Sequence, residues 1–162
     1  MLLASLVSGA AAEPGGAQVV RVEAEENFRL EPNGTRLATL AAGTELDFVE
    51  ARDTWVRATL DGWVWAASLQ STDRNGFDLV VSASGGENLR EHPRGRVLGR
   101  LSEGTLLDEI ERSTGWVRVQ RTGWIWRVSV EVDETRAPSS RSPEVDREAD
   151  GGGATPPGGR AT

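Results

Sequence analysis

Residues 55–69, WVRATLDGWVWAASL, occur a second time as residues 116–130, WVRVQRTGWIWRVSV. An offset of 61 positions (116 − 55) aligns the two copies without a gap, and all six tryptophans lie within them. The same offset aligns further identical residues upstream: Asn27 with Asn88, Arg29 with Arg90, Pro32 with Pro93, Gly34 with Gly95, Leu40 with Leu101, and Gly43-Thr44 with Gly104-Thr105. The chain is therefore an internal duplication. We predict domains at residues 19–69 and 77–132, joined by a linker at 70–76.

Composition limits both the fold and the chemistry. The chain has 162 residues, so each repeat holds about 50 to 55 residues, near the lower limit for independent folding. Cysteine is absent, which removes disulfides and thiolate metal sites. The formal net charge of −7 argues against a general nucleic-acid binder, because such binding needs a basic surface.

The two ends of the chain differ in composition from the repeats. Residues 1–12, MLLASLVSGAAA, are apolar and end in small residues, as in a secretory signal peptide cleaved before Glu13. A frayed, alanine-rich N-terminus is the alternative, because a basic first region is missing. This run is too short to span a bilayer. Residues 133–162 are rich in Pro, Gly, Ser and charge, and we expect a disordered tail.

Within each repeat, short runs of β-favouring residues alternate with turn signals. In the first repeat we expect turns at residues 31–34, of type I, at 42–44, and at Asp61-Gly62. A sustained helical period is absent, and five short strands with turns every eight to twelve residues are typical of a small closed barrel. The predicted fold is therefore all-β, with two consecutive small β-barrels. The strand near Glu109, which aligns with Phe48, has an uncertain register.

Each repeat resembles a bacterial SH3 domain. The resemblance rests on an N-R-x-x-P element, a G-T turn, a W-V-R strand and a closing G-W-V/I segment, all present twice in the same order. It implies an SH3-like barrel used for binding, commonly in exported or envelope proteins. The sequence departs from eukaryotic SH3 domains, because it has no tyrosine, and Trp65 and Ser68 stand where the proline and closing tyrosine of the peptide groove would be. Docking of a PxxP peptide is therefore not expected.

The tryptophans are the main candidates for ligand contact. Three indoles per repeat exceed what so small a core can hold, so we expect some of them to be exposed, where they would offer a flat apolar face and an N–H donor. We assign ligand contact to Trp55, Trp65, Trp116 and Trp126, with core or inter-repeat packing as the alternative. For Trp63 and Trp124, packing is the preferred interpretation.

Arginines and the single histidine are weaker candidates. Arg90 and Arg94, with Arg96 and Arg100, form a basic cluster that could pair with carboxylates of a peptide stem, but such a cluster is more often a solvated surface, and Glu87 and Glu91 lie nearby. His92 has no counterpart in the first repeat and lacks a nucleophile and an orienting acid, so we interpret it as a turn residue. Catalysis, a cofactor and a bound metal are not predicted.

Together these features favour a non-enzymatic, exported binding module. The predicted ligand is a cell-envelope component, peptidoglycan or its stem peptides, and the predicted location is periplasmic or secreted. The alternative is an adaptor that binds a periplasmic partner protein.

Overall fold

The computed structural model describes residues 18–133, and every structural statement below concerns this part of the chain. The predicted signal segment at 1–12 and the predicted tail from 134 onward lie outside it. Asp133 does not open a tail, because it ends the last strand and pairs with Val19.

The described chain is all-β, as predicted, with short 3₁₀ turns at Ala66–Ser68, Arg74–Gly76 and Arg127–Ser129. The first repeat supplies β1 (Val19–Val22), β2 (Glu26–Arg29), β3 (Arg36–Leu40), β4 (Glu45–Arg52), β5 (Trp55–Trp65) and β6 (Leu69–Ser71). The second supplies β7 (Leu79–Val81), β8 (Glu87–Arg90), β9 (Val97–Leu101), β10 (Leu106–Ser113), β11 (Trp116–Trp126) and β12 (Val130–Asp133). The bounds of β2, β3, β4 and β5 coincide with those of β8, β9, β10 and β11 at the offset of 61, since, for example, 55 + 61 = 116. The expected linker is partly structured, because β6 continues into it.

The longest strands, β5 and β11, have no turn where one was predicted. β5 runs without interruption through Asp61 and Gly62, so the turn predicted there is wrong. The physical reason is a close backbone approach: a Cβ on Gly62 would lie 2.8 Å from the carbonyl oxygen of Arg90, and one on Gly123 would lie 2.7 Å from that of Arg29. Glycine inside a strand often marks such an approach. These glycines let a hairpin of the other repeat cross the strand.

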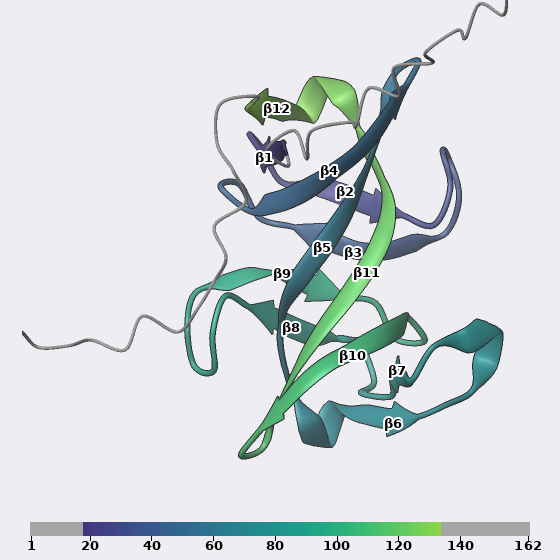
Figure 1. The fold of residues 1–162 in the computed structure, drawn as a ribbon, viewed down its shortest axis with the longest axis vertical. Coiled ribbons are helices and arrows are strands. Elements are labelled where there is room, and N and C mark those ends of the chain that lie inside the picture. The colour runs from purple at the N-terminus through teal and green to yellow at the C-terminus, as the bar shows by residue number, and fades with distance from the viewer. Residues whose placement is uncertain (1–17, 134–162) are drawn as a thin grey trace, which may run out of the picture.

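β5 and β11 pair with each other along their whole length in antiparallel orientation (Figure 1). Trp65 faces Trp116 at one end of the ladder, and Trp55 faces Trp126 at the other. At the centre Leu60 faces Arg121, its own counterpart at the offset (60 + 61 = 121). The two repeats are thus related by an approximate two-fold axis through this ladder.

Six strands close a barrel that draws equally on both repeats. The ladders run from β5 to β8, β9, β3, β2 and β11, and β11 pairs back with β5. From this ring β4, β1 and β12 extend on one side, and β10, β7 and β6 on the other. Between residues 18 and 133 no ring of ladders forms from one repeat alone. Two consecutive barrels are therefore not confirmed by the strand pairing.

The terminal strands are exchanged between the repeats in the same way. β12, which ends the second repeat, pairs with β1, which opens the first. By the approximate symmetry β6, which ends the first repeat, pairs with β7 of the second. The last part of each repeat thus completes the sheet of the other.

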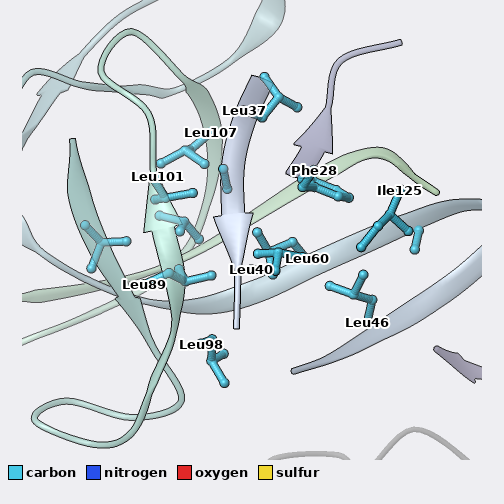
Figure 2. Close-up of a cluster of buried hydrophobic side chains, with 14 of the residues drawn as sticks. Phe28, Leu37, Leu40, Leu46, Leu60, Leu89, Leu98, Leu101, Leu107 and Ile125 are labelled. Atoms are coloured by element: carbon cyan, nitrogen blue, oxygen red, sulfur yellow. The ribbon is translucent and has the colours of Figure 1, made fainter. Parts of the chain in front are cut away.

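One hydrophobic cluster fills the interior (Figure 2). Its largest fully buried side chains come from both repeats: Phe28, Leu40 and Leu46 from the first, and Leu89, Leu98, Leu101, Leu107 and Ile125 from the second. Because apolar burial is the main favourable term in folding, the repeats share their principal source of stability.

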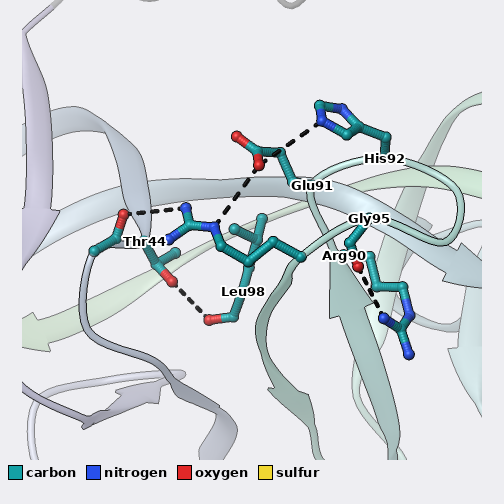
Figure 3. Close-up of polar contacts among 8 residues, drawn as sticks. Thr44, Arg90, Glu91, His92, Gly95 and Leu98 are labelled. Carbon is teal, nitrogen blue, oxygen red and sulfur yellow. Dashed lines mark hydrogen bonds and ion pairs between the residues drawn. The ribbon is translucent and has the colours of Figure 1, made fainter.

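The repeated G-T motif ties the two repeats together. The buried hydroxyl of Thr44 donates a hydrogen bond to the carbonyl of Leu98 at 2.6 Å (Figure 3), and the equivalent Thr105 donates to the carbonyl of Leu37 at 2.8 Å. The preceding Gly43 has a φ of 83°, which favours glycine. The motif thus serves a contact between the copies.

Two local expectations are refined by the structure. The turn at residues 31–34 forms, with Gly34 donating to the carbonyl of Glu31 at 2.8 Å, but the φ of 59° at Asn33 is that of type II rather than the predicted type I. The uncertain strand at Glu109 keeps the register of its counterpart, since β4 and β10 show the same shift at Phe48 and Glu109. Glu109, which takes the place of Phe48, accepts two hydrogen bonds from the guanidinium of Arg112.

Candidate functional site

The six tryptophans are unequally buried, and the expectation of exposed indoles is confirmed. Trp65 and Trp126 remain 45% and 47% exposed, whereas Trp124 is buried at 7%. Trp55, Trp63 and Trp116 are half-buried. None of the six belongs to the central cluster of buried side chains. Alternation along β5 explains why these tryptophans lie outside the core cluster, because Val64 points into the core while Trp63 and Trp65 point away from it.

Trp65 and Trp116 form the best-defined aromatic surface. Their ring centroids lie 5.3 Å apart with an interplanar angle of 74°, an edge-to-face arrangement. Gly115 makes room for this pair, since a Cβ there would lie 3.0 Å from the Trp65 ring, and its φ of 75° also favours glycine. A shallow hollow of about 280 Å³ adjoins Trp116 and is lined by Ala66, Arg112, Ser113, Thr114 and Gly115.

Arg112 brings a charged but satisfied group to this hollow. Its guanidinium donates two hydrogen bonds of 2.8 Å to the carboxylate of Glu109. The hydrogen bond and charge of Glu109 raise the pKa of Arg112 above its ordinary value. The lining of the hollow therefore combines the apolar indole of Trp116 with an arginine whose charge is balanced by Glu109.

The other two tryptophan candidates lie at the far end of the same ladder. Trp55 faces Trp126 in register, and Thr54 stands where the first surface has Gly115. The ladder of 11 residues spans roughly 33 Å at about 3.3 Å per residue. The four tryptophans thus form two separate surfaces, each built from one indole of each repeat.

The predicted arginines are not gathered at either tryptophan surface. Arg90 donates to the carbonyl of Gly95 at 2.8 Å (Figure 3), and Arg29 makes the same 2.8 Å contact with Gly34 in the first repeat. The arginine of the N-R-x-x-P element thus holds its own turn. Arg94 is exposed at the tip of that turn, with a φ of 62°.

The remaining members of the basic cluster contact backbone carbonyls. Arg96 donates to the carbonyl of Gly43 at 3.3 Å and lies 3.7 Å from Glu91, which also lies 3.8 Å from His92 (Figure 3). Arg100 donates to the carbonyls of two glycines, Gly85 and Gly86. These contacts fit the interpretation of a hydrogen-bonded surface.

An ion pair that the sequence did not predict joins the two long strands. The guanidinium of Arg118 donates to both carboxylate oxygens of Asp61, at 2.9 and 3.1 Å, and Gln120 donates to the same carboxylate at 2.9 Å. The hydrogen bonds from Arg118 to Asp61 raise the pKa of Arg118. Period-two alternation places Asp61 on one face, but it does not show which strand of the other repeat it will face.

We expect Asp61→Asn to lower the free energy of unfolding by about 1 to 3 kcal/mol, because it removes the charge from a partly buried double hydrogen bond. Urea denaturation followed by circular dichroism measures this. The control is Glu50→Gln, whose carboxylate pairs with the exposed Arg52 and Arg57 and should change stability by about 0 to 1 kcal/mol. Equal effects of the two variants would contradict the structural role of Asp61.

Comparisons with protein-family models, with curated proteins and with solved structures found no match. Among residues 18–133, no group of three or more His, Asp or Glu side chains is placed to hold a metal ion. The same part of the chain has no helix with the length and apolar character needed to cross a membrane.

Proposed function

We propose that the chain is an exported, non-enzymatic binding module that recognises peptidoglycan or its stem peptides through its tryptophan surfaces. In this proposal the repeats are SH3-like units that have exchanged their C-terminal strands, so that the sheet of each unit contains strands of the other copy. The observation that carries the proposal is the edge-to-face pair of the exposed Trp65 and the half-buried Trp116 beside an open hollow.

The physical support is the chemistry of an exposed indole. Leaving Trp65 and Trp126 nearly half exposed forgoes apolar burial worth about 25 cal/mol per Å². An indole face stacks on sugar rings and peptide planes, while its N–H donates a hydrogen bond. Two such surfaces at opposite ends of one rigid ladder suit a repetitive polymer, because binding at one surface raises the effective concentration at the other.

We expect purified protein to sediment with isolated cell-wall sacculi. The double variant Trp65→Ala with Trp126→Ala should lose at least 90% of this retention, about a tenfold reduction or more, because both indoles that contact the ligand are removed. Both side chains are exposed, so the variant should remain folded. The matched control is Val49→Ala, which truncates a similarly exposed apolar residue on β4 at 46% exposure and should sediment like the parent protein.

A pull-down separates this proposal from the adaptor alternative. Retention on sacculi that is independent of Trp65 and Trp126 would contradict the tryptophan-based mechanism. Recovery of one protein partner in stoichiometric amount, with no wall material, would instead support an adaptor.

A further inference from the structure

A second hollow lies near the centre of the β5–β11 ladder, apart from the tryptophan pair described above. It has a volume of about 310 Å³ and an open mouth, and both repeats line it. Leu30 and Arg57 come from the first repeat, and Phe77, Asp108, Arg121, Thr122, Gly123 and Trp124 from the second. A volume of this size accommodates a small organic molecule.

Arg121 is the unusual member of this hollow. It occupies the position equivalent to Leu60, which is a core residue, and is itself only 7% exposed. Its Nε and Nη1 atoms are buried and have no hydrogen-bond partner. Its guanidinium stacks on the ring of Phe77, with Cζ 4.1 Å from the ring centroid. Unpaired donors of a buried cation are costly, and they are satisfied most effectively by an anion.

The approximate symmetry also shows that Arg57 lacks the aspartate that its equivalent, Arg118, binds. Arg118 is held by Asp61, but the equivalent Arg57 has Thr122 at the equivalent position (57 + 61 = 118 and 61 + 61 = 122). Arg57 instead pairs with the exposed carboxylate of Glu50, at 3.8 Å. At the position where the first repeat places Asp61, the second repeat thus has Thr122, which carries no charge.

The surrounding charges select the valence of the missing anion. Arg57 and Arg121 bring two positive charges to the lining, and two negative charges stand against them, from Asp108 in the same lining and from Glu50, 3.8 Å from Arg57. Burial lowers the pKa of Arg121, and the charge of Asp108 partly offsets this shift. Arginine stays protonated in proteins, so the guanidinium is a cation. The unpaired donors of Arg121 therefore favour a monoanion, whereas a phosphate dianion would place a further negative charge next to Asp108 and Glu50.

We propose that this hollow binds a small monocarboxylate, with the carboxylate on the guanidinium of Arg121 and Arg57 and the apolar part of the ligand between Phe77 and Trp124. A planar guanidinium fork matches a carboxylate in a bidentate manner. Thr122 also lines the hollow, and its hydroxyl shares a hydrogen bond of 2.9 Å with that of Thr59. This site is independent of the proposed sacculus binding, since none of Trp65, Trp116 or Trp126 lines it.

The test titrates the full chain with N-acetylglycine and follows the side-chain N–H signals of Arg121 and Trp124 by NMR. We expect saturable shifts of both signals and a rise in Tm at saturating ligand, because the ligand binds the folded state. The uncharged N-acetylglycinamide and inorganic phosphate should each bind at least tenfold more weakly. Equal binding of the amide, or equal or tighter binding of phosphate, would overturn the assignment of a monocarboxylate.

Two variants locate the binding. Arg121→Leu copies Leu60 at the equivalent position, so it should fold with an unchanged or higher Tm and bind N-acetylglycine at least tenfold more weakly. Thr122→Asp copies Asp61, supplies an internal carboxylate to Arg57, and should reduce binding by a similar factor even if Arg121→Leu fails to fold. Trp65→Ala is the control and should bind N-acetylglycine like the parent. Retained affinity in either hollow variant, or no saturable binding by the parent, would overturn the proposal.

Discussion

Phe28→Ala should lower the free energy of unfolding by about 3 to 5 kcal/mol, the range for truncating a fully buried aromatic side chain. Phe28 is 0% exposed, and its ring edge occupies the space beside Gly123 of the other repeat, where a Cβ would lie 2.8 Å from Cε1. The lost contacts therefore belong to both repeats. Guanidinium denaturation monitored by tryptophan fluorescence and by circular dichroism measures the change.

The shape of that transition is as informative as its midpoint. Because the core and the closed ring combine both repeats, Phe28→Ala should shift one cooperative transition without changing its slope. Leu89→Ala, at the equivalent position (28 + 61 = 89), should do the same although it lies in the other repeat. Val128→Ala, 72% exposed, is the control and should change stability by no more than about 0.5 kcal/mol. Two separate transitions, each sensitive to only one variant, would contradict a shared core.

The second large effect is expected at Gly99, where β9 pairs with β3. A Cβ at this position would lie 2.4 Å from the carbonyl oxygen of Thr39 and 3.0 Å from Cα of Leu40. Both are backbone atoms of a paired strand and cannot move without opening the ladder that joins the repeats. We expect Gly99→Ala to cost about 3 kcal/mol or more, at the upper end of overpacking effects. Thermal unfolding of the purified variant gives the value.

Gly76→Ala is a demanding control for this prediction. Gly76 has a φ of 80°, which disfavours alanine, but nothing lies within 4 Å of its virtual Cβ. Its cost should therefore be limited to backbone strain of about 1 kcal/mol. A Gly99→Ala variant as stable as Gly76→Ala would show that the β3–β9 ladder is not tightly packed.

Local structure could be predicted from this sequence because the duplication supplied two copies of every signal. The turns expected at residues 31–34 and 42–44 both form, the first with Gly34 donating to the carbonyl of Glu31 and the second with Thr44 donating to that of Ala41. The surplus of indoles also followed from volume alone, and Trp65 and Trp126 are exposed accordingly. These properties depend on residues close in sequence or on simple packing limits.

The sequence could not predict which strand of one repeat pairs with which strand of the other, because the same strand and turn signals occur in both copies. An Asp-Gly pair between two strands indicates a hairpin, yet at Asp61-Gly62 the glycine admits the backbone of Arg90 and the strand continues. Alternation likewise predicts that Arg121 points inward, as Leu60 does, but not that its buried nitrogens lack partners beside Phe77. The second hollow exists only because strands of different repeats meet there.

The pairing of β1 with β12 sets the order in which a nascent chain can mature. Val19 can pair with Asp133 only after Asp133 has been translated, 114 residues later (133 − 19). At about 5 to 20 residues per second this delay is roughly 6 to 23 s. During that interval the earlier half has an unpaired strand edge and an incomplete interior. The complete sheet therefore cannot form before the last strand has been made, because β12 pairs with β1.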